Sequence, residues 1–320
     1  MSVFAFASCG SGSAAKTQQA AVQESRPKAP AVNADSAHAY VARQVSFGPR
    51  VPGTEPSRQC AQWLVETLGA LGAGNVTRQQ AEVTAYNGDR LPISNISAQI
   101  NPAADKRILL LAHWDTRPWA DQEPDPALRD KPIDGANDGA SGVGVILEIL
   151  RAMRQSPPSV GVDMLFVDAE DYGTRADAPA PGSDESWALG TQYWMQYPTL
   201  DLSKVRYAVL LDMVGGKDAV FPREYFSNTH ARGVVDKIWR QAEKSGFGSR
   251  FPNNVGGAIT DDHVHLIAGG IPAVDIIEIG HPATGSFNPS WHTHADNLDG
   301  IDRETLRVVA QTVINQIYEE

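Results

Sequence analysis

Apolar and polar positions follow two patterns along most of this chain. Short continuous apolar runs are typical of strands buried on both faces, and segments with apolar residues every three or four positions are typical of helices that pack on one face. The first pattern predicts strands at residues 108–112, 162–167, 207–211 and 274–279. The second predicts helices at residues 35–47, 56–71, 143–153, 186–197, 231–244, 261–268 and 303–318.

Two further extended segments precede the first buried strand. Residues 80–86 and 93–100 flank Asn87-Gly88-Asp89, and Asn-Gly is a strong signal for a hairpin turn. Buried strands that alternate with helices indicate a mostly parallel twisted sheet with helices on both faces, and the hairpin would form its antiparallel edge. The sequence therefore predicts a single α/β domain over residues 35–320.

The first part of the chain has a different composition. Residues 10–34 are rich in Ala, Ser, Gln, Gly and Pro, with almost no large apolar residues, which predicts a flexible tether. The short apolar stretch before it ends at Cys9, so residues 1–9 resemble the end of a bacterial lipoprotein signal. We therefore expect a lipid anchor at Cys9 and a location in the cell envelope or periplasm.

Charge and cysteine content limit the function classes. The formal net charge of −11 argues against nucleic acid as a partner, because phosphate binding needs basic surfaces. No apolar run reaches the roughly 18–20 residues of a membrane span. The two cysteines, Cys9 and Cys60, lie far apart and lack zinc-finger spacing, so a bound metal would take nitrogen and oxygen ligands. Cys60 falls in a helical pattern and is predicted to pack as a small apolar residue.

Candidate metal ligands lie after the predicted strands, where the ligand site of a parallel sheet forms. Asp138 stands in a Gly-rich turn before a helix, Asp171 follows a buried strand, and His292 lies in a later loop. Taken alone, Asp138 reads as a helix cap and His292 as an ordinary packed histidine. Together they offer two carboxylates and an imidazole, which suit a catalytic zinc site with one open position.

Further acids stand beside these candidate ligands. Glu170 immediately precedes Asp171 and would remain free as a general base or acid. Asp212 ends an apolar strand, where a carboxylate is unfavourable unless it is paired. Asp261 and the adjacent Asp262 offer partners, because two close carboxylates tend to share one proton.

Aromatic residues provide candidates for a pocket wall. Trp291 directly precedes His292, so it would wall a small apolar pocket next to an open metal position. Trp187 and Phe287 are weaker candidates for the same wall, since each has ordinary packing as the simpler interpretation. We predict a substrate pocket that contains Trp291, with Trp187 and Phe287 beside it.

The order of the motifs resembles the zinc aminopeptidase superfamily, and within it the glutaminyl cyclases of the animal secretory type and their bacterial relatives. Asp261 stands where the aminopeptidases usually carry Ser, and Trp291 where they usually carry Tyr. Asp171 is a departure, because the animal cyclases have Glu there. The motifs are His113-Trp-Asp115, Asn137-Asp138-Gly-Ala-Ser-Gly142, Glu170-Asp171, Asp212-Met213, Asp261-Asp262-His263 and Trp291-His292-Thr293.

The resemblance implies a fold, a cofactor and a reaction. It implies cyclisation of the N-terminal glutamine of peptides to pyroglutamate, with release of ammonia. It assigns the proton transfer to Glu170 and makes Asp212 and Asp261 a hydrogen-bonded acid pair. We expect a monomer acting on peptides and proteins that begin with Gln. The resemblance assigns one Zn²⁺ per chain to Asp138, Asp171 and His292.

Two other interpretations remain open at this point. A two-zinc aminopeptidase would use His113, Asp212 and a bridging Asp138 for its second ion, with Glu170 activating a water molecule. All of these residues are present, so zinc stoichiometry must separate the two enzymes. A lipoprotein binding module without activity is disfavoured, because Glu170 serves catalysis rather than metal binding.

Overall fold

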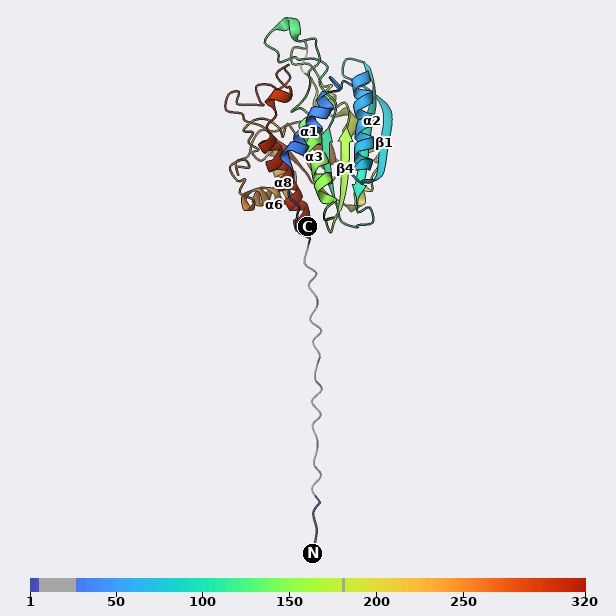
Figure 1. Cartoon of the computed structure of the whole chain (residues 1–320), viewed down its shortest axis with the longest axis vertical. Helices are drawn as coiled ribbons and strands as arrows, with labels where there is room; N and C mark the ends of the chain where they lie inside the picture. The colour runs from blue at the N-terminus through green and yellow to red at the C-terminus, as the bar shows by residue number, and fades with distance from the viewer. Residues whose placement is uncertain (6–26, 180–181) are drawn as a thin grey trace.

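One mixed sheet forms the centre of the molecule. The computed structural model describes residues 1–5, 27–179 and 182–320 (Figure 1). The sheet has the strand order β1-β2-β4-β3-β5-β6. Strand β2 is antiparallel to β1 and β4, whereas β4, β3, β5 and β6 run parallel. The predicted parallel sheet with an antiparallel edge hairpin is confirmed. The strands are β1 (Gly74–Thr84), β2 (Arg90–Ile100), β3 (Arg107–His113), β4 (Gly161–Val167), β5 (Val205–Asp212) and β6 (Ala273–Ile277).

Helices cover both faces of the sheet, as predicted. Alternate residues of a strand point to opposite faces, so Ile108 and Leu110 pack into one core while Leu109 and Leu111 pack into another. Helices α1, α3 and α8 contact one another over the first face (Figure 1). Helices α4 and α7 cover the second face. The helices are α1 (Ala34–Val45), α2 (Glu55–Ala70), α3 (Ala140–Met153), α4 (Leu189–Gln196), α5 (Tyr225–His230), α6 (Arg232–Lys244), α7 (Asp262–Ala268) and α8 (Arg303–Glu319).

Several boundaries differ from the sequence-based prediction. Helix α4 begins three residues later than expected, because Ala188 adopts a left-handed conformation with φ of 54° and cannot continue a right-handed helix. Strand β1 begins at Gly74 rather than near residue 80, since this edge strand is half-exposed and carries polar residues on both faces. The short helix α5 was not predicted, because six residues are too few for a clear helical period.

The last residues of the predicted tether contact the domain. The Val32 amide donates to Gln311 Oε1 of α8 at 3.1 Å, and the Asn33 amide donates to Glu148 Oε1 of α3 at 2.5 Å. Asn33 also caps α1 by accepting the Ser36 amide. These contacts fix the entry of the chain into α1. Cys9 lies outside the described residues.

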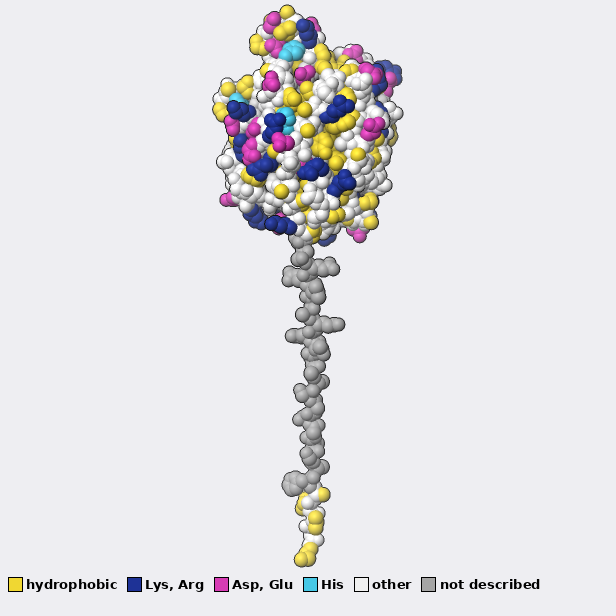
Figure 2. Space-filling model, in the orientation of Figure 1, with side chains coloured by type: hydrophobic (Ala, Val, Ile, Leu, Met, Phe, Trp, Pro, Cys, Tyr) yellow, Lys and Arg dark blue, Asp and Glu magenta, His cyan; other side chains and the backbone are white. Residues whose placement is uncertain are grey.

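The surface is mixed in charge on the face that Figure 2 displays. Lys and Arg side chains are interspersed there with Asp and Glu, and apolar side chains lie between them. Within the described residues, no helix combines the length and apolar character that a bilayer crossing requires. Cys60 is fully buried in α2 and packs in the main core, as the sequence predicts.

The parallel strands all end at the same edge of the sheet, and the loops that follow them carry the predicted site residues. Helix α3 packs unusually close to β5 at this edge. A Cβ atom added at Gly142, in the first turn of α3, would overlap the Leu211 carbonyl oxygen of β5. Glycine at this position therefore lets the start of α3 sit directly beside the end of β5, which brings Asp138 and Asp212 together.

Candidate metal centre and active site

The three predicted metal ligands converge. Asp138 precedes α3, Asp171 follows β4, and His292 lies in the loop between β6 and α8. His292 Nε2 lies 3.2 Å from Asp171 Oδ1 and 3.6 Å from Asp138 Oδ2. All three side chains are buried, and one ligand atom from each lies within 4.8 Å of the others. The structure therefore assembles the predicted ligand set from three distant parts of the chain.

The geometry of this group fits a bound metal ion. Ligand atoms about 2.0–2.1 Å from a tetrahedral zinc lie roughly 3.4 Å apart, close to the separations between His292 and the two carboxylates. Asp171 Oδ2 is buried without a hydrogen-bond partner, which is unfavourable unless a cation satisfies it. Burial and the nearby Asp138 raise the pKa of Asp171, as expected for acids that face one another without an ion.

A carboxylate and a guanidinium stand behind the candidate ligands. Asp121 Oδ1 lies 3.3 Å from His292 Nδ1, the ring nitrogen that does not face the other ligands. Arg117 donates to Asp121 at 2.8 and 2.6 Å and to Asp171 Oδ1 at 3.2 Å. Burial favours the neutral acid, yet Arg117 and His292 hold the pKa of Asp121 below its ordinary range. The sequence analysis missed Asp121, because only its spacing of four residues from Arg117 marks it.

Two further buried carboxylates fix the loops that carry the ligands. Asp296 accepts the backbone amides of Asn137 at 2.7 Å and Asp138 at 3.1 Å. Asp115 accepts the amides of Glu170 at 3.1 Å and Asp171 at 3.2 Å. Charge-assisted bonds of this kind orient the loops strongly. Asp296 was not predicted, since it lies three residues beyond the last motif and touches the site only through backbone atoms.

The residues of the alternative second metal site also lie together. His113 Nε2 is 3.0 Å from Asp138 Oδ1 and 3.2 Å from Asp212 Oδ1, while its Nδ1 is 3.4 Å from Asp115 Oδ1. Burial opposes protonation of His113, but these carboxylates raise its pKa well above the ordinary value. The imidazole therefore lies at hydrogen-bond distance from both carboxylates that a second ion would need.

Glu170 lines the same cavity as the candidate ligands but does not belong to their group. Burial and the charge of Asp261 raise the pKa of Glu170 well above its ordinary value. Burial also raises the pKa of Asp212 to about 6. Asp261 caps α7 and accepts the Asp262 amide at 2.5 Å. Burial and the nearby charge of Asp212 raise the pKa of Asp261 well above its ordinary value, so the two carboxyls lie close to each other. A hydrogen bond between them stays a prediction.

Aromatic side chains wall a small cavity over the ligands. The cavity has a volume of about 250 Å³, and Trp187, Phe287 and Trp291 line it together with Glu170 and His292. The rings of Trp291 and His292 stack with centroids 3.7 Å apart, and Phe287 lies 4.6 Å from Trp291. Trp187 is nearly parallel to His292 at 6.2 Å. All three predicted aromatic residues therefore border the cavity, which is sized for one small side chain.

The backbone is strained where it carries the site residues. Ala169 precedes Glu170 with φ of 53°, Met213 follows Asp212 with φ of 47°, and His292 itself has φ of 56°. Residues other than glycine rarely adopt this left-handed conformation, which costs about 1–3 kcal/mol at each position. Such strain clusters at functional sites because it aims side chains that a relaxed turn would direct elsewhere.

Comparisons with known proteins support this picture. Residues 95–317 match the model of peptidase family M28. The crystal structure of Bacteroides thetaiotaomicron glutaminyl cyclase bound to N-acetylhistamine is 46% identical, covers 92% of this chain and 100% of its own, and superposes with a TM-score of 0.89. A leucine aminopeptidase precursor from the same organism is 45% identical, with coverage of 92% and 99% and a TM-score of 0.88. The curated glutaminyl-peptide cyclotransferase of Bos taurus is 26% identical over 80% of this chain and 74% of its own.

Proposed function

The chain belongs to peptidase family M28, and from that premise we propose that it cyclises the N-terminal glutamine of peptides and proteins to pyroglutamate. Its similarity to glutaminyl cyclases over nearly the whole chain supports this reaction. The single observation that carries the proposal is the small aromatic cavity in which Glu170 lies beside one convergent ligand set. Such a cavity suits an intramolecular reaction of one side chain.

The proposed reaction balances within the substrate. The α-amine nitrogen forms a bond to the side-chain amide carbon, the original bond from that carbon to the amide nitrogen breaks, and ammonia leaves. The nucleophile belongs to the substrate, so the enzyme needs no activated water. Asp138, Asp171 and His292 would hold one Zn²⁺ per chain, and the bound ion would supply Lewis acidity toward the amide carbonyl oxygen.

Glu170 moves the proton in this proposal. As a carboxylate it accepts a proton from the attacking amine, and as an acid it returns the proton to the leaving nitrogen. Its raised pKa makes the carboxyl group a stronger base than an exposed glutamate, which favours removal of a proton from the amine. Asp212 and Asp261 line the same cavity as Glu170. After burial, the charge of Asp261 contributes most to the raised pKa of Glu170.

The aromatic walls orient the substrate. Trp187, Phe287 and Trp291 leave room for one side chain, so the glutamine must fold back toward its own amine. Holding two reacting groups in this geometry lowers the entropic part of the barrier. The walls also keep bulk water from the amide carbon, which favours cyclisation over hydrolysis.

A two-zinc aminopeptidase is the second candidate, and the grouping of His113, Asp138 and Asp212 favours it. His113 Nε2 lies 3.0 and 3.2 Å from the two carboxylates, close to the spacing between ligands of one zinc ion, so metal analysis must separate the two enzymes.

One assay separates the two enzymes. The purified, zinc-loaded chain is incubated with a Gln-initiated peptide and with a Leu-initiated peptide of otherwise identical sequence. The cyclase releases ammonia from the first and leaves the second intact, whereas the aminopeptidase frees leucine. Metal analysis of the same preparation gives about one zinc per chain for the cyclase and about two for the aminopeptidase. Free leucine together with two zinc ions would overturn the proposal.

We further propose that Cys9 carries a lipid and that the enzyme acts as a monomer in the cell envelope of a bacterium. The apolar stretch that ends at Cys9 and the polar segment that follows support an anchor with a tether. Labelled fatty acid should enter the wild-type chain in bacterial cells and not the Cys9→Ala variant. On size-exclusion chromatography, the detergent-solubilised or anchor-free chain should elute at the mass of one copy. Labelling of the Cys9→Ala variant would refute the lipid anchor, and elution at a larger mass would refute the monomer.

A further inference from the structure

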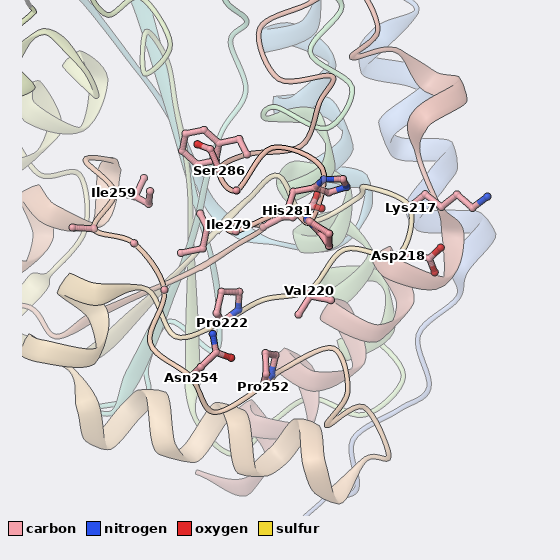
Figure 3. Close-up of a pocket in the computed structure, with 18 residues that line it drawn as sticks. Lys217, Asp218, Val220, Pro222, Pro252, Asn254, Ile259, Ile279, His281 and Ser286 are labelled. Atoms are coloured by element: carbon pink, nitrogen blue, oxygen red, sulfur yellow. The ribbon is translucent and has the colours of Figure 1, made fainter.

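A second, larger depression adjoins the catalytic cavity. It has a volume of about 610 Å³ and is bounded by three segments (Figure 3). The first, residues 217–222, follows β5; the second, residues 252–259, precedes α7; the third, residues 278–287, follows β6. We call this depression the β6 groove. Its volume falls in the range of about 300–1,000 Å³ that is typical of ligand sites.

The β6 groove is continuous with the catalytic cavity. Ala258, Ile259 and Phe287 line both. The catalytic cavity is sized for one side chain, so the peptide that follows the N-terminal glutamine must leave it along an adjoining surface. In Figure 3, Ile259 lies at one side of the groove and Lys217 at the other, so the groove leads away from the catalytic cavity.

The walls of the β6 groove are largely apolar. Val220, Pro222, Pro252, Ile259 and Ile279 face it from all three segments (Figure 3). Residue 256 is a glycine that packs closely against Ile279, because an added Cβ atom would overlap the Ile279 side chain. Apolar surface of this shape stabilises a buried apolar side chain.

Exposed apolar residues concentrate at the rim of the same groove. Among residues 27–179 and 182–320, five large apolar side chains are exposed. Three of them border the groove: Val220 is 38% exposed and lines it, Val255 is 48% exposed beside the lining Asn254, and Tyr225 is 48% exposed and bonded through its amide to Gly257. Apolar side chains gathered in this way mark an interaction site rather than ordinary surface.

One buried acid sets the polarity of the floor. Glu278 lines the β6 groove, is 2% exposed, and accepts a hydrogen bond from Asn288 Nδ2 at 3.2 Å through Oε2. A carboxylate there accepts hydrogen bonds from peptide N–H groups and repels acidic side chains. Lys217 and Asp218 line the end of the groove away from Ile259 with opposite charges (Figure 3). The remaining groove combines apolar walls with the acid Glu278 at its floor, and both features disfavour Asp and Glu in a ligand.

We propose that the β6 groove binds the second and third residues of the substrate peptide and selects an apolar side chain directly after the N-terminal glutamine. The inference rests on the proposed cyclase function and adds the substrate class to it. Peptides that begin Gln-Phe or Gln-Leu are preferred, and peptides that begin Gln-Asp are disfavoured.

The experiment measures kcat and KM with the zinc-loaded enzyme on Gln-Phe-Ala-amide, Gln-Ala-Ala-amide, Gln-Asp-Ala-amide and glutamine amide. We expect kcat/KM for the Phe peptide to exceed that for the Ala peptide about tenfold, mainly through KM, because burying the ring contributes ~1.4 kcal/mol or more. The Asp peptide should fall below the Ala peptide. Glutamine amide reports the catalytic cavity alone.

Variants locate the preference. Val220→Asp should lower kcat/KM for the Phe peptide about tenfold and leave glutamine amide unchanged, whereas Val220→Leu should keep the wild-type preference. Tyr197→Asp is the matched control, since Tyr197 is 58% exposed and lies outside the groove. Equal rates for the Phe, Ala and Asp peptides with active turnover of glutamine amide would overturn the inference and leave the cyclase intact. Loss of turnover on all four substrates would overturn both.

Discussion

Asp121 Oδ1 lies 3.3 Å from Nδ1 of His292, while Nε2 of the same ring faces Asp171 and Asp138. A carboxylate behind a histidine ligand fixes the ring orientation and makes the other nitrogen a better donor to a metal. We predict that Asp121→Ala weakens zinc binding roughly 10–100-fold. Competition with a chromogenic chelator measures the affinity.

The control for this prediction is Asp105→Ala. Asp105 is an exposed aspartate that pairs with Lys204 at 3.4 Å, so its loss should leave zinc affinity unchanged. Because Asp121 also holds Arg117, Asp121→Asn serves as a milder variant, and circular dichroism verifies that both variants fold. Wild-type zinc affinity in both folded variants would refute the role of Asp121.

Glu170 is predicted to serve proton transfer and not metal binding. Glu170→Gln should retain about one zinc per chain and lose roughly 10²–10⁴-fold in kcat, because the amide cannot accept and return the proton. Ammonia release and metal analysis of the same sample test both statements. Glu185→Gln, an exposed glutamate of the following loop, should keep wild-type kcat. A Glu170→Gln enzyme with near-normal kcat would remove Glu170 from its proposed role.

Glu224 is predicted to make stability depend on pH in the acid range. Burial favours the neutral acid, but His263 at 3.1 Å and the amides of Ser227 and Phe226 outweigh it and lower the pKa of Glu224 to about 2 from 4.5. A folded-state pKa below the unfolded one stabilises the fold above pH 4.5, and this stabilisation is lost as the pH falls toward 2.

The measurement compares wild type with Glu224→Gln. Urea titrations between pH 7 and pH 2.5 should show that the wild-type free energy of unfolding falls more steeply with acid, by a difference of roughly 2–3 kcal/mol over the range. Other buried acids titrate in both proteins, so the difference isolates Glu224. Parallel curves for the two proteins would contradict the prediction.

The close approach of α3 to β5 predicts an asymmetric effect of two glycine substitutions. Gly142→Ala should destabilise the protein by roughly 3 kcal/mol or more, because its Cβ would overlap the Leu211 carbonyl oxygen. Gly69→Ala, in α2 with no neighbouring atom within 4 Å, should stabilise it by roughly 0.5–1 kcal/mol. Thermal unfolding of the two variants provides the comparison. Similar melting temperatures would contradict the prediction and show that α3 shifts to accommodate the added methyl group at residue 142.

Much of the fold followed from local pattern. Continuous apolar runs placed the four parallel strands, and Asn87-Gly88 placed the edge hairpin, because burial on both faces and a tight turn each impose their own residue types. The same pattern missed the first residues of β1 and the start of α4. The half-exposed edge strand β1 lacks the continuous apolar run that marks a buried strand. The left-handed conformation of Ala188 depends on the surrounding loop and not on its residue type.

Part of the candidate site could also be predicted from the sequence, and part could not. The sequence singled out Asp138, Asp171 and His292 as candidate metal ligands, because carboxylates and an imidazole suit a metal ion, and the structure brings the three together. The sequence did not identify Asp121 or Asp296, which act by touching His292 or a backbone amide and have no motif of their own. The predicted hydrogen bond between Asp212 and Asp261 stays a prediction, and the structure adds a contact of 3.2 Å between Asp212 Oδ1 and His113 Nε2.

The sequence by itself determined which elements form and which side chains have the chemistry to bind a metal or carry a proton, because these depend on residue type and spacing. Only the tertiary structure decided which of those side chains meet, what lies behind each ligand, and where the β6 groove opens beside Ile259. Contacts between residues a hundred or more positions apart depend on how strands and helices pack. The local pattern of apolar and polar residues carries no information about which distant segments pack together.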